Sequence, residues 1–276
     1  VKMYVNIKKI NEEDYERIFV MTDLHGCYDL FTKIIDEVNF TKKDLLIIMG
    51  DSCDRGEYTY ELYNWYVTRQ NEGYSIIHLL GNHEDMLLKS RTDERYRLNW
   101  MCNGGIKTVE SFFKNQYKIE DIEEYCDQEE FYNTGWIFEF IEKMPNIVES
   151  ENHLFVHAGI DFSKKLSEQK ARYTVWTRDD WQENNETGKR VYYGHTPQLD
   201  GISVINDCIN LDRGAFHTGI LSCVEIKENK IYTVEKDKVN VENFEILHNN
   251  RKNGIIYTSL SWIKTSLKKI KARNRD

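Results

Sequence analysis

Residues 45–56 read LLIIMGDSCDRG, an apolar run followed at once by a glycine, two carboxylates and an arginine. A short continuous run rich in branched aliphatic side chains is typical of a β-strand that is buried on both faces. Four other apolar runs are also followed directly by polar side chains of the kind that bind metals and phosphate; they are residues 18–21, 76–80, 154–156 and 191–193. The sequence therefore predicts five buried strands with candidate site residues at their carboxyl ends.

The segments between the first three runs predict helices. Residues 28–38 place apolar side chains at helical spacing, and residues 58–67 follow a similar pattern. Strands that alternate with helices form an α/β sheet, and such sheets hold their active sites just beyond the carboxyl ends of the strands. Residues 202–234 instead contain short alternating runs separated by turn residues, which predicts antiparallel strands. We therefore expect an α/β fold in which two sheets are packed together between helices.

The chain is predicted to consist of a catalytic domain, residues 1–245, and a tail, residues 246–276. Within the domain, residues 85–143 are rich in Glu, Tyr and Trp and are expected to form a helical insertion beside the site. In the tail, apolar residues recur at spacings of three and four among eight lysines and arginines, which predicts a basic amphipathic helix. Its apolar face either packs on the domain or docks the helix on an acidic partner or an anionic surface.

The composition excludes several classes of protein. The formal net charge is −9, with 46 Asp and Glu against 37 Lys and Arg, whereas general nucleic-acid binding requires clustered positive charge. No apolar stretch approaches the roughly 18 residues that a membrane-spanning helix needs. The six cysteines form no Cys-x-x-Cys pair, which indicates free thiols in a reducing compartment. We therefore expect a cytoplasmic protein without a transmembrane segment and without general nucleic-acid binding.

The side chains that follow the five runs form one set of metal-ligand types. They are Asp23, His25, Asp51, Asp54, Asn82, His83, His157 and His195. Mixed carboxylate, amide and imidazole donors without a thiolate suit Mn, Fe or Zn rather than a structural zinc site. A carboxylate shared by two ions closes a two-metal site, and such a site stabilises both the attacking and the leaving oxygen of an in-line displacement. Hydrolysis of a phosphoester is therefore the predicted reaction.

The same strings, in the same order, resemble those of the calcineurin-like metallophosphoesterases, and within them the phosphoprotein phosphatases of bacteria and phages. The matching strings are Asp-x-His-Gly at 23–26, Gly-Asp-x-x-Asp-Arg-Gly at 50–56, Gly-Asn-His-Glu at 81–84, His-Ala-Gly at 157–159 and Gly-His-Thr-Pro at 194–197. The resemblance covers residues 17–234. It implies an α/β/β/α sandwich of two mixed β-sheets flanked by helices.

The resemblance also implies which residues hold two divalent metal ions. Asp23 and His25 would hold one ion, and Asp51 would bridge to the second. The remaining ligands of the second ion would be Asn82, His157 and His195. Mn²⁺ is the first expectation for both positions, with Fe, Zn, Ni and Co as alternatives.

Catalytic and phosphate-binding roles follow from the same resemblance. A hydroxide that bridges the metals would attack phosphorus directly, and His83 would act as the general acid, oriented by Asp54. Arg55 would clamp phosphate oxygens through its planar guanidinium, and Asn82 would contact them as well. The string Trp-Thr-Arg at residues 176–178 is similar to the segment that supplies a second phosphate-binding arginine in phage lambda-type protein phosphatases, which gives Arg178 that role.

The resemblance leaves the substrate open between two classes. The first is phosphorylated serine or threonine in proteins. The alternative is dinucleoside polyphosphates such as diadenosine tetraphosphate, because Leu80 stands where the eukaryotic Ser/Thr phosphatases place a phosphate-contacting arginine and so resembles the symmetrical bis(5′-nucleosyl)-tetraphosphatases. A non-catalytic scaffold is disfavoured because every matched ligand is present, and a nuclease or phosphodiesterase is disfavoured by the grouping of Asp54, Arg55 and His83.

Three features near the motifs are interpreted less specifically. Residues 103–108, which begin Asn-Gly-Gly, resemble a segment of small bacterial relatives and are expected to line the pocket. Arg213 replaces the threonine of an Asp-Thr-Gly-Ala string and points either to the substrate or to solvent. The position of His217, which follows two residues after Ala215, is left open.

The remaining histidines and two cysteines near the motifs have simpler interpretations. His78 lies inside an apolar run and is predicted to be buried in its strand, whereas His153 and His248 are predicted to lie in loops. Cys27 and Cys53 lie inside metal-binding strings. They are either oxidation-sensitive thiols or, as we favour, ordinary small buried residues.

Overall fold

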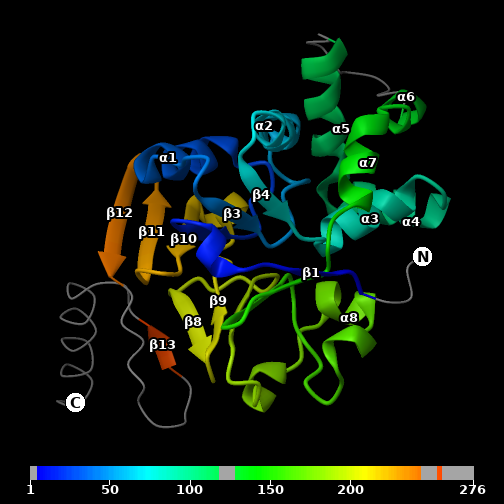
Figure 1. Ribbon diagram of the computed structural model, residues 1–276. Helices are drawn as coiled ribbons and strands as arrows, with labels where there is room; N and C mark the ends of the chain where they lie inside the picture. Colours follow the sequence, from blue (N-terminus) through cyan, green and yellow to red (C-terminus); the bar gives the residue numbers. More distant parts are fainter. Residues whose placement is uncertain (1–4, 118–127, 244–253, 257–276) are drawn as a thin grey trace, which may run out of the picture.

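The computed structural model describes residues 5–117, 128–243 and 254–256. It consists of two β-sheets that pack face to face, with helices against their outer faces (Figure 1). One sheet has the strand order β12-β11-β10-β2-β3-β4. In that order, the strands span Lys238–Asn243, Lys230–Glu235, Ile220–Glu225, Ile18–Met21, Leu45–Ile48 and Ser75–His78. Strands β2, β3 and β4 run parallel and the other neighbours are antiparallel.

The second sheet has the order β1-β5-β6-β7-β9-β8-β13. In that order, the strands span Ile7–Lys9, Ile147–Glu149, His153–Val156, Arg190–Tyr193, Cys208–Asn210, Ile202–Ile205 and Gly254–Ile256. It is also mixed, because β6, β7 and β9 are parallel while β5–β6 and β8–β9 are antiparallel. The predicted α/β sandwich of two mixed sheets is confirmed. The antiparallel strands expected over residues 202–234 are divided, with β8 and β9 in this sheet and β10 and β11 in the other.

Helices connect the strands much as the periodicity predicts. Helix α1 spans the predicted residues, and α2 extends four residues beyond its predicted end. The described helices are α1 Tyr28–Val38, α2 Thr59–Asn71, α3 Asn82–Ser90, α4 Glu94–Trp100, α5 Ile106–Phe112, α6 Gln128–Tyr132, α7 Gly135–Glu142, α8 Ala171–Trp176 and α9 Ala215–Thr218. Short 3₁₀ or π turns occur at Glu12–Asp14, Met101–Gly105, Phe113–Tyr117, Leu166–Glu168 and Trp181–Asn184.

Helices α3 to α7 gather at one end of the molecule (Figure 1), over the range predicted as a helical insertion. The domain boundary at residue 245 stays a prediction. The predicted tail helix lies outside the described residues, of which only strand β13 falls in the tail. Within the described part of the chain, no helix has the length and apolar character to span a membrane.

The side chains of the strands alternate between an inner and an outer hydrophobic core. Ile18 and Val20 of β2 belong to the core between the two sheets, together with Phe155 of β6. Phe19 and Met21 belong to the core between the first sheet and its helices. This alternation follows from the two-residue period of a strand and explains why the strand is apolar throughout.

The polar residues that interrupt the apolar runs mark the ends of the strands. Strands β2, β3 and β4 are in register as a parallel set, so their carboxyl ends meet at one edge of the sheet. Just past these ends, and past β7, six site residues other than glycine have a positive φ: Asp23 (52°), His25 (42°), Asp51 (55°), Asp54 (71°), Arg55 (69°) and His195 (69°). Left-handed backbone is uncommon for residues other than glycine, although Asp and His adopt it more readily than most, and it clusters at functional sites.

Candidate active site

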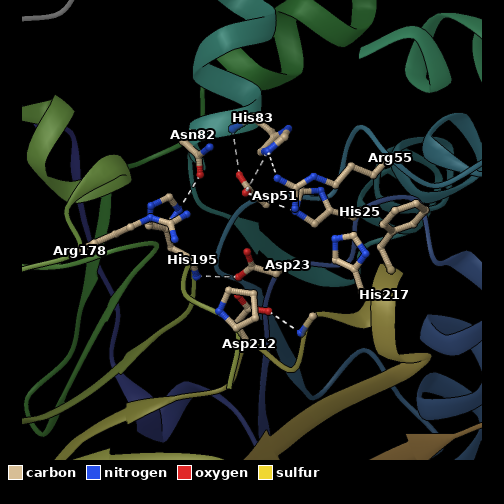
Figure 2. Close-up of a pocket in the computed structure, with 13 residues that line it drawn as sticks. Asp23, His25, Asp51, Arg55, Asn82, His83, Arg178, His195, Asp212 and His217 are labelled. Carbon is tan, nitrogen blue, oxygen red and sulfur yellow. Dashed lines mark hydrogen bonds and ion pairs between the residues drawn. The ribbon is translucent and has the colours of Figure 1, made fainter. Parts of the chain in front are cut away.

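A cavity of about 220 Å³ lies at the shared edge of the strands (Figure 2). It is lined by Asp23, His25, Asp51, Arg55, Asn82, His83, Arg178, His195, Pro197, Asp212, Gly214, Phe216 and His217. Apart from His157 and Asp54, every residue that the sequence assigned to the site lines it. Those two lie in the layer of side chains directly behind, and both are fully buried.

Asp51 stands between two groups of potential metal ligands. Its Oδ2 lies 3.6 Å from Nε2 of His25, and its Oδ1 lies 3.5 Å from Nε2 of His157. One group joins Asp51 with His25 and His83, and the other joins it with His157 and His195. A single carboxylate thus faces two sets of imidazoles, which is the arrangement that a shared ligand requires.

Backbone carbonyls orient the histidine rings of the site. Nδ1 of His25 donates to the Cys53 carbonyl and Nδ1 of His157 donates to the Met49 carbonyl, both at 2.8 Å. Each ring therefore presents the lone pair of Nε2 to the site. Burial lowers the pKa of both histidines, so the rings are neutral near pH 7.

Asn82 and His195 complete the second group. Oδ1 of Asn82 lies 2.9 Å from Nε2 of His157 and 2.8 Å from Nδ1 of His195. Burial, with smaller contributions from His157 and Arg178, lowers the pKa of His195 to about 2. Nδ1 of His157 already donates to the Met49 carbonyl, so its Nε2 lone pair faces the Asn82 oxygen with no proton between the two atoms. Two acceptors held this close together are costly, and a cation between them is one group that satisfies both.

The carboxylates of the site lie close together. Oδ2 of Asp23 accepts from the Thr22 hydroxyl at 2.6 Å and from the backbone N–H of His195 at 3.0 Å. Burial, followed by the charges of Glu84 and Asp23, holds the pKa of Asp51 well above its usual range. Asp212 also lines the cavity, and burial together with Asp23 raises its pKa. Such crowding of buried carboxyl groups is what a divalent cation relieves.

His83 and Asp54 form a buried pair beside this cluster. Nδ1 of His83 donates to Oδ2 of Asp54 at 2.7 Å, and Nε2 of His83 accepts from Nη2 of Arg55 at 2.9 Å. Trp100 and Thr108 also donate to Asp54, at 2.9 and 2.7 Å. Asp54 is thus fixed from behind, and the His83 ring is held with Nε2 toward the cavity. The sequence interpretation missed Trp100, and no local signal marked it.

The guanidinium of Arg55 lies across the cavity face of the two histidines. Nη1 donates to Nε2 of His25 at 3.0 Å, while Nη2 contacts His83 (Figure 2). Its backbone N–H donates to the carbonyl of Gly104 at 3.2 Å. Residues 103–108 therefore support Arg55 and Asp54 from behind, and the expectation that they line the pocket is wrong. Gly104 packs directly against the backbone of Arg55, and the Thr108 hydroxyl donates to Asp54, so the segment contacts these residues and is absent from the cavity lining.

Glu84 holds the backbone on which Asp51 stands. It is fully buried and accepts from the backbone N–H groups of Asp51, Ser52 and Gly81 at 2.9, 2.8 and 3.1 Å, and from the Tyr63 hydroxyl at 2.7 Å. Burial raises the pKa of Glu84, but the charge of His78 and the hydrogen bonds from these donors outweigh it and bring the pKa to about 2. An ionised carboxylate therefore lies beneath the left-handed turn at Asp51.

We expect Glu84→Gln to lower the free energy of unfolding by about 2–4 kcal/mol, because an amide cannot accept from all four donors and its own N–H groups face donors. The folded pKa of about 2 lies below the ordinary 4.5. The stabilisation is therefore complete above pH 4.5 and is lost as the pH falls toward 2. Urea unfolding of the native protein and of Glu84→Gln, both without metal, is measured at pH 7 and at several pH values between 4.5 and 2. The difference in the free energy of unfolding between the two proteins should be largest at pH 7 and should shrink as the pH falls.

Glu228→Gln is the matched control, because that carboxylate pairs with Lys230 at the surface. Exposed ion pairs contribute only about 0–1 kcal/mol. An equal loss of stability in the two variants at pH 7 would contradict the role given to Glu84.

Two glycines of the motifs are required by close approach of the backbone. A Cβ added to Gly56 would lie 2.2 Å from the carbonyl oxygen of His25, and one added to Gly81 would lie 2.1 Å from Oδ1 of Asp51. Neither distance is compatible with a side chain. The glycines therefore let the three strand-end turns pack against one another, which brings the ligands together.

Arg213 and His217 differ in their relation to the cavity, and the two cysteines inside the motifs have raised thiol pKa values. Arg213 does not line the cavity; it donates to the carbonyls of Gln198 and Leu199 at 2.8 and 3.3 Å. His217 does line it. Burial raises the pKa of Cys27 to about 12 and holds that of Cys53 well above its usual range, so both thiols are protonated near pH 7.

Predictions for the other histidines are confirmed in one case. His78 is buried in β4, where its Nε2 lies 2.7 Å from the Ser52 hydroxyl. The loop prediction for His153 is wrong: it is the first residue of β6, and its Nδ1 lies 2.7 Å from the carboxylate of Glu12. That pairing joins segments far apart in the chain and has no local signal. His248 lies outside the described residues.

Comparisons with known proteins agree with this geometry. The family model described as calcineurin-like phosphoesterase matches residues 16–215. Serine/threonine-protein phosphatase 2 of Salmonella typhimurium is 28% identical over 235 residues, which cover 79% of this chain and 96% of that protein. An asymmetrical bis(5′-nucleosyl)-tetraphosphatase of Bacillus velezensis is 22% identical over 240 residues, covering 78% and 91%. The solved structure of a protein serine/threonine phosphatase from Saccharomyces cerevisiae shares the fold, with a TM-score of 0.55, 15% identity and coverage of 90% and 87%.

Proposed function

The chain belongs to the calcineurin-like phosphoesterases and is a hydrolase of phosphoric esters; on that premise we propose that its cavity is a two-metal phosphatase site acting on phosphomonoesters. The observation that carries the proposal is the position of Asp51, within 3.6 Å of imidazole nitrogens on both sides, with the His83–Asp54 pair beside it. The first substrate class is phosphorylated serine or threonine in proteins.

The residues present fit two divalent cations. The neutral imidazoles, the crowded carboxylates and the acceptor atoms of Asn82 and His157 that face each other all favour positive charge in the cavity. Asp23 and His25 would hold one ion, Asp51 would be shared, and the other ligands of the second ion would be Asn82, His157 and His195. The donor set suits Mn²⁺ first, with Fe, Zn, Ni and Co as alternatives. When bound, such ions supply positive charge to the phosphoryl oxygens and activate the attacking water.

The chain's own residues supply the proton and the phosphate contacts. His83, protonated at Nε2, donates a proton to the leaving oxygen as general acid, while Asp54 accepts from Nδ1 and stabilises the charged ring. Arg55 exchanges its contacts with His25 and His83 for phosphate oxygens, which match its two parallel N–H groups. Arg178 and Asn82 lie on the side of the cavity opposite Arg55 (Figure 2), from which the Arg178 guanidinium and the amide group of Asn82 would contact the phosphate.

Dinucleoside polyphosphates are the second candidate substrate. Leu80, half-buried against the outer core, contributes no positive charge near the phosphate site, and a relative named as a bis(5′-nucleosyl)-tetraphosphatase aligns over most of the chain. Turnover of phosphopeptides, diadenosine tetraphosphate and mononucleotides, measured side by side, decides between the two classes.

We also propose a cytoplasmic location, which the free thiols of the described residues support. For the basic tail we propose docking on an acidic partner or an anionic surface.

Removal of metal should abolish hydrolysis of an aryl phosphate, because the ligand residues cannot activate water alone. Treatment with a chelator, removal of the chelator by gel filtration and addition of Mn²⁺ should restore the activity. Hydrolysis rate is the measurement, and a mock-treated sample is the control. Full activity after chelation with no residual metal by elemental analysis, or no activity with any divalent ion, would contradict the proposal.

A further inference from the structure

The wall of the cavity formed by helix α9 is not used by the chemistry described above. Phe216 and His217 of this helix line the cavity beside Asp212 and Gly214. Both side chains are exposed, Phe216 to 43%, and their ring centroids lie 5.0 Å apart. Figure 2 shows the His217 ring next to His25, on the side opposite Arg178. Phe216 is the one large apolar side chain in a lining that is otherwise polar except for Pro197 and Gly214.

The backbone beneath these two rings is firmly held. Gly214 and Gly219, with φ values of 62° and 68°, flank the single turn of α9. The hydroxyl of Thr218 donates to the carbonyl of Arg213 at 2.8 Å, and the buried Arg213 side chain donates to the carbonyl of Gln198. Rings presented on a fixed turn lose little conformational freedom when a ligand binds.

The two rings contribute little to the fold. Phe216 belongs to none of the hydrophobic clusters of the described residues. An aromatic side chain that leaves nearly half its surface exposed gains only part of the free energy of burial. A single exposed apolar residue requires no explanation by itself, but this one lies beside a second ring in the lining of the candidate phosphate site.

We propose that Phe216 and His217 form a subsite for a flat aromatic ring in the same substrate molecule as the phosphate group that Arg55 and Arg178 hold. The inference rests on the proposed function and specifies its substrate. Flat rings bind to aromatic side chains in offset or edge-to-face contact, and nucleobases do so regardless of sequence. The ring is either a nucleobase or an aromatic side chain next to a phosphorylated residue, and the experiment separates these sources.

Adenosine 5′-monophosphate and ribose 5-phosphate carry the same phosphate and sugar and differ by the base. As competitive inhibitors of aryl phosphate hydrolysis with Mn²⁺, the first should have an inhibition constant about tenfold lower in the native protein, as one stacked base predicts. In Phe216→Ala and in His217→Ala the ratio should fall below about two. A second arm compares kcat/KM for phosphoserine peptides with Phe or Leu next to phosphoserine.

If the two substitutions lower only the ratio of inhibition constants for the two phosphates, the subsite binds a nucleobase. If they lower only the preference in kcat/KM for the peptide with Phe over the one with Leu, the subsite binds a peptide side chain. Leu98→Ala is the control, because Leu98 is 64% exposed on α4 and does not line the cavity. Equal inhibition by the two compounds and no preference for Phe in peptides would overturn the subsite while hydrolysis persists. Absence of metal-dependent hydrolysis and of inhibition by inorganic phosphate would instead overturn the proposed function.

Discussion

His83→Asn should lower kcat about 10²–10⁴-fold for alkyl phosphates such as phosphoserine peptides, because the general acid is removed. The asparagine amide retains a donor for Asp54 and keeps the buried carboxylate partnered. With an aryl phosphate whose leaving group is already a weak base, protonation matters less and the loss should be smaller. The measurement is kcat for both substrates at saturating Mn²⁺, and the informative quantity is the ratio of the two losses.

His153→Asn provides the matched control, since its Nδ1 also pairs with a carboxylate, that of Glu12, but outside the cavity. It should leave both kcat values within about twofold, as expected for a change far from the reacting atoms. If His83→Asn lowers kcat by the same factor for the alkyl and the aryl phosphate, His83 is a structural support rather than the proton donor. Thermal unfolding of both variants excludes loss of the folded state as the cause.

Local patterns in the sequence were sufficient to predict the position of the strand-end ligands. The apolar run before Asp51 predicts a buried strand, and the carboxyl ends of parallel strands meet by geometry alone. Asp23 and Asn82 follow β2 and β4, the strands on either side of β3, and reach the same cavity for that reason. Predictions of this kind succeed because each depends on a short window and on one rule of chain topology.

The side chains that support the site could not be predicted in the same way. Trp100 donates to Asp54 from 46 residues further along the chain, and Tyr63 reaches Glu84 from a helix. Neither residue differs in the sequence from the many aromatic residues that fill the core. The direction of Arg213 depends on two backbone carbonyls of a loop. These contacts depend on how elements pack, which no local periodicity encodes.

Asp51→Asn should lower kcat/KM for an aryl phosphate by more than about 100-fold, since residues that only orient metal ligands are already worth about 10–100-fold. The amide oxygen preserves the acceptor for the backbone N–H of His83, so the variant removes charge and little else. Burial and the neighbouring carboxylates raise the pKa of Asp51, which means that its ionised form is unfavourable without metal. The metal-free variant should therefore unfold at a temperature equal to or above that of the native protein.

Metal separates this effect from a general loss of structure. A ligand that binds only the folded state raises the unfolding temperature, so Mn²⁺ should stabilise the native protein and stabilise Asp51→Asn far less. Asp36→Asn, an exposed carboxylate of α1, should respond to Mn²⁺ like the native protein. An Asp51→Asn protein that keeps its activity and its full thermal response to Mn²⁺ would mean that the carboxylate is not shared by the ions. Lower stability without metal would instead mean that Asp51 supports the fold, because its charge would then be favourable in the empty cluster.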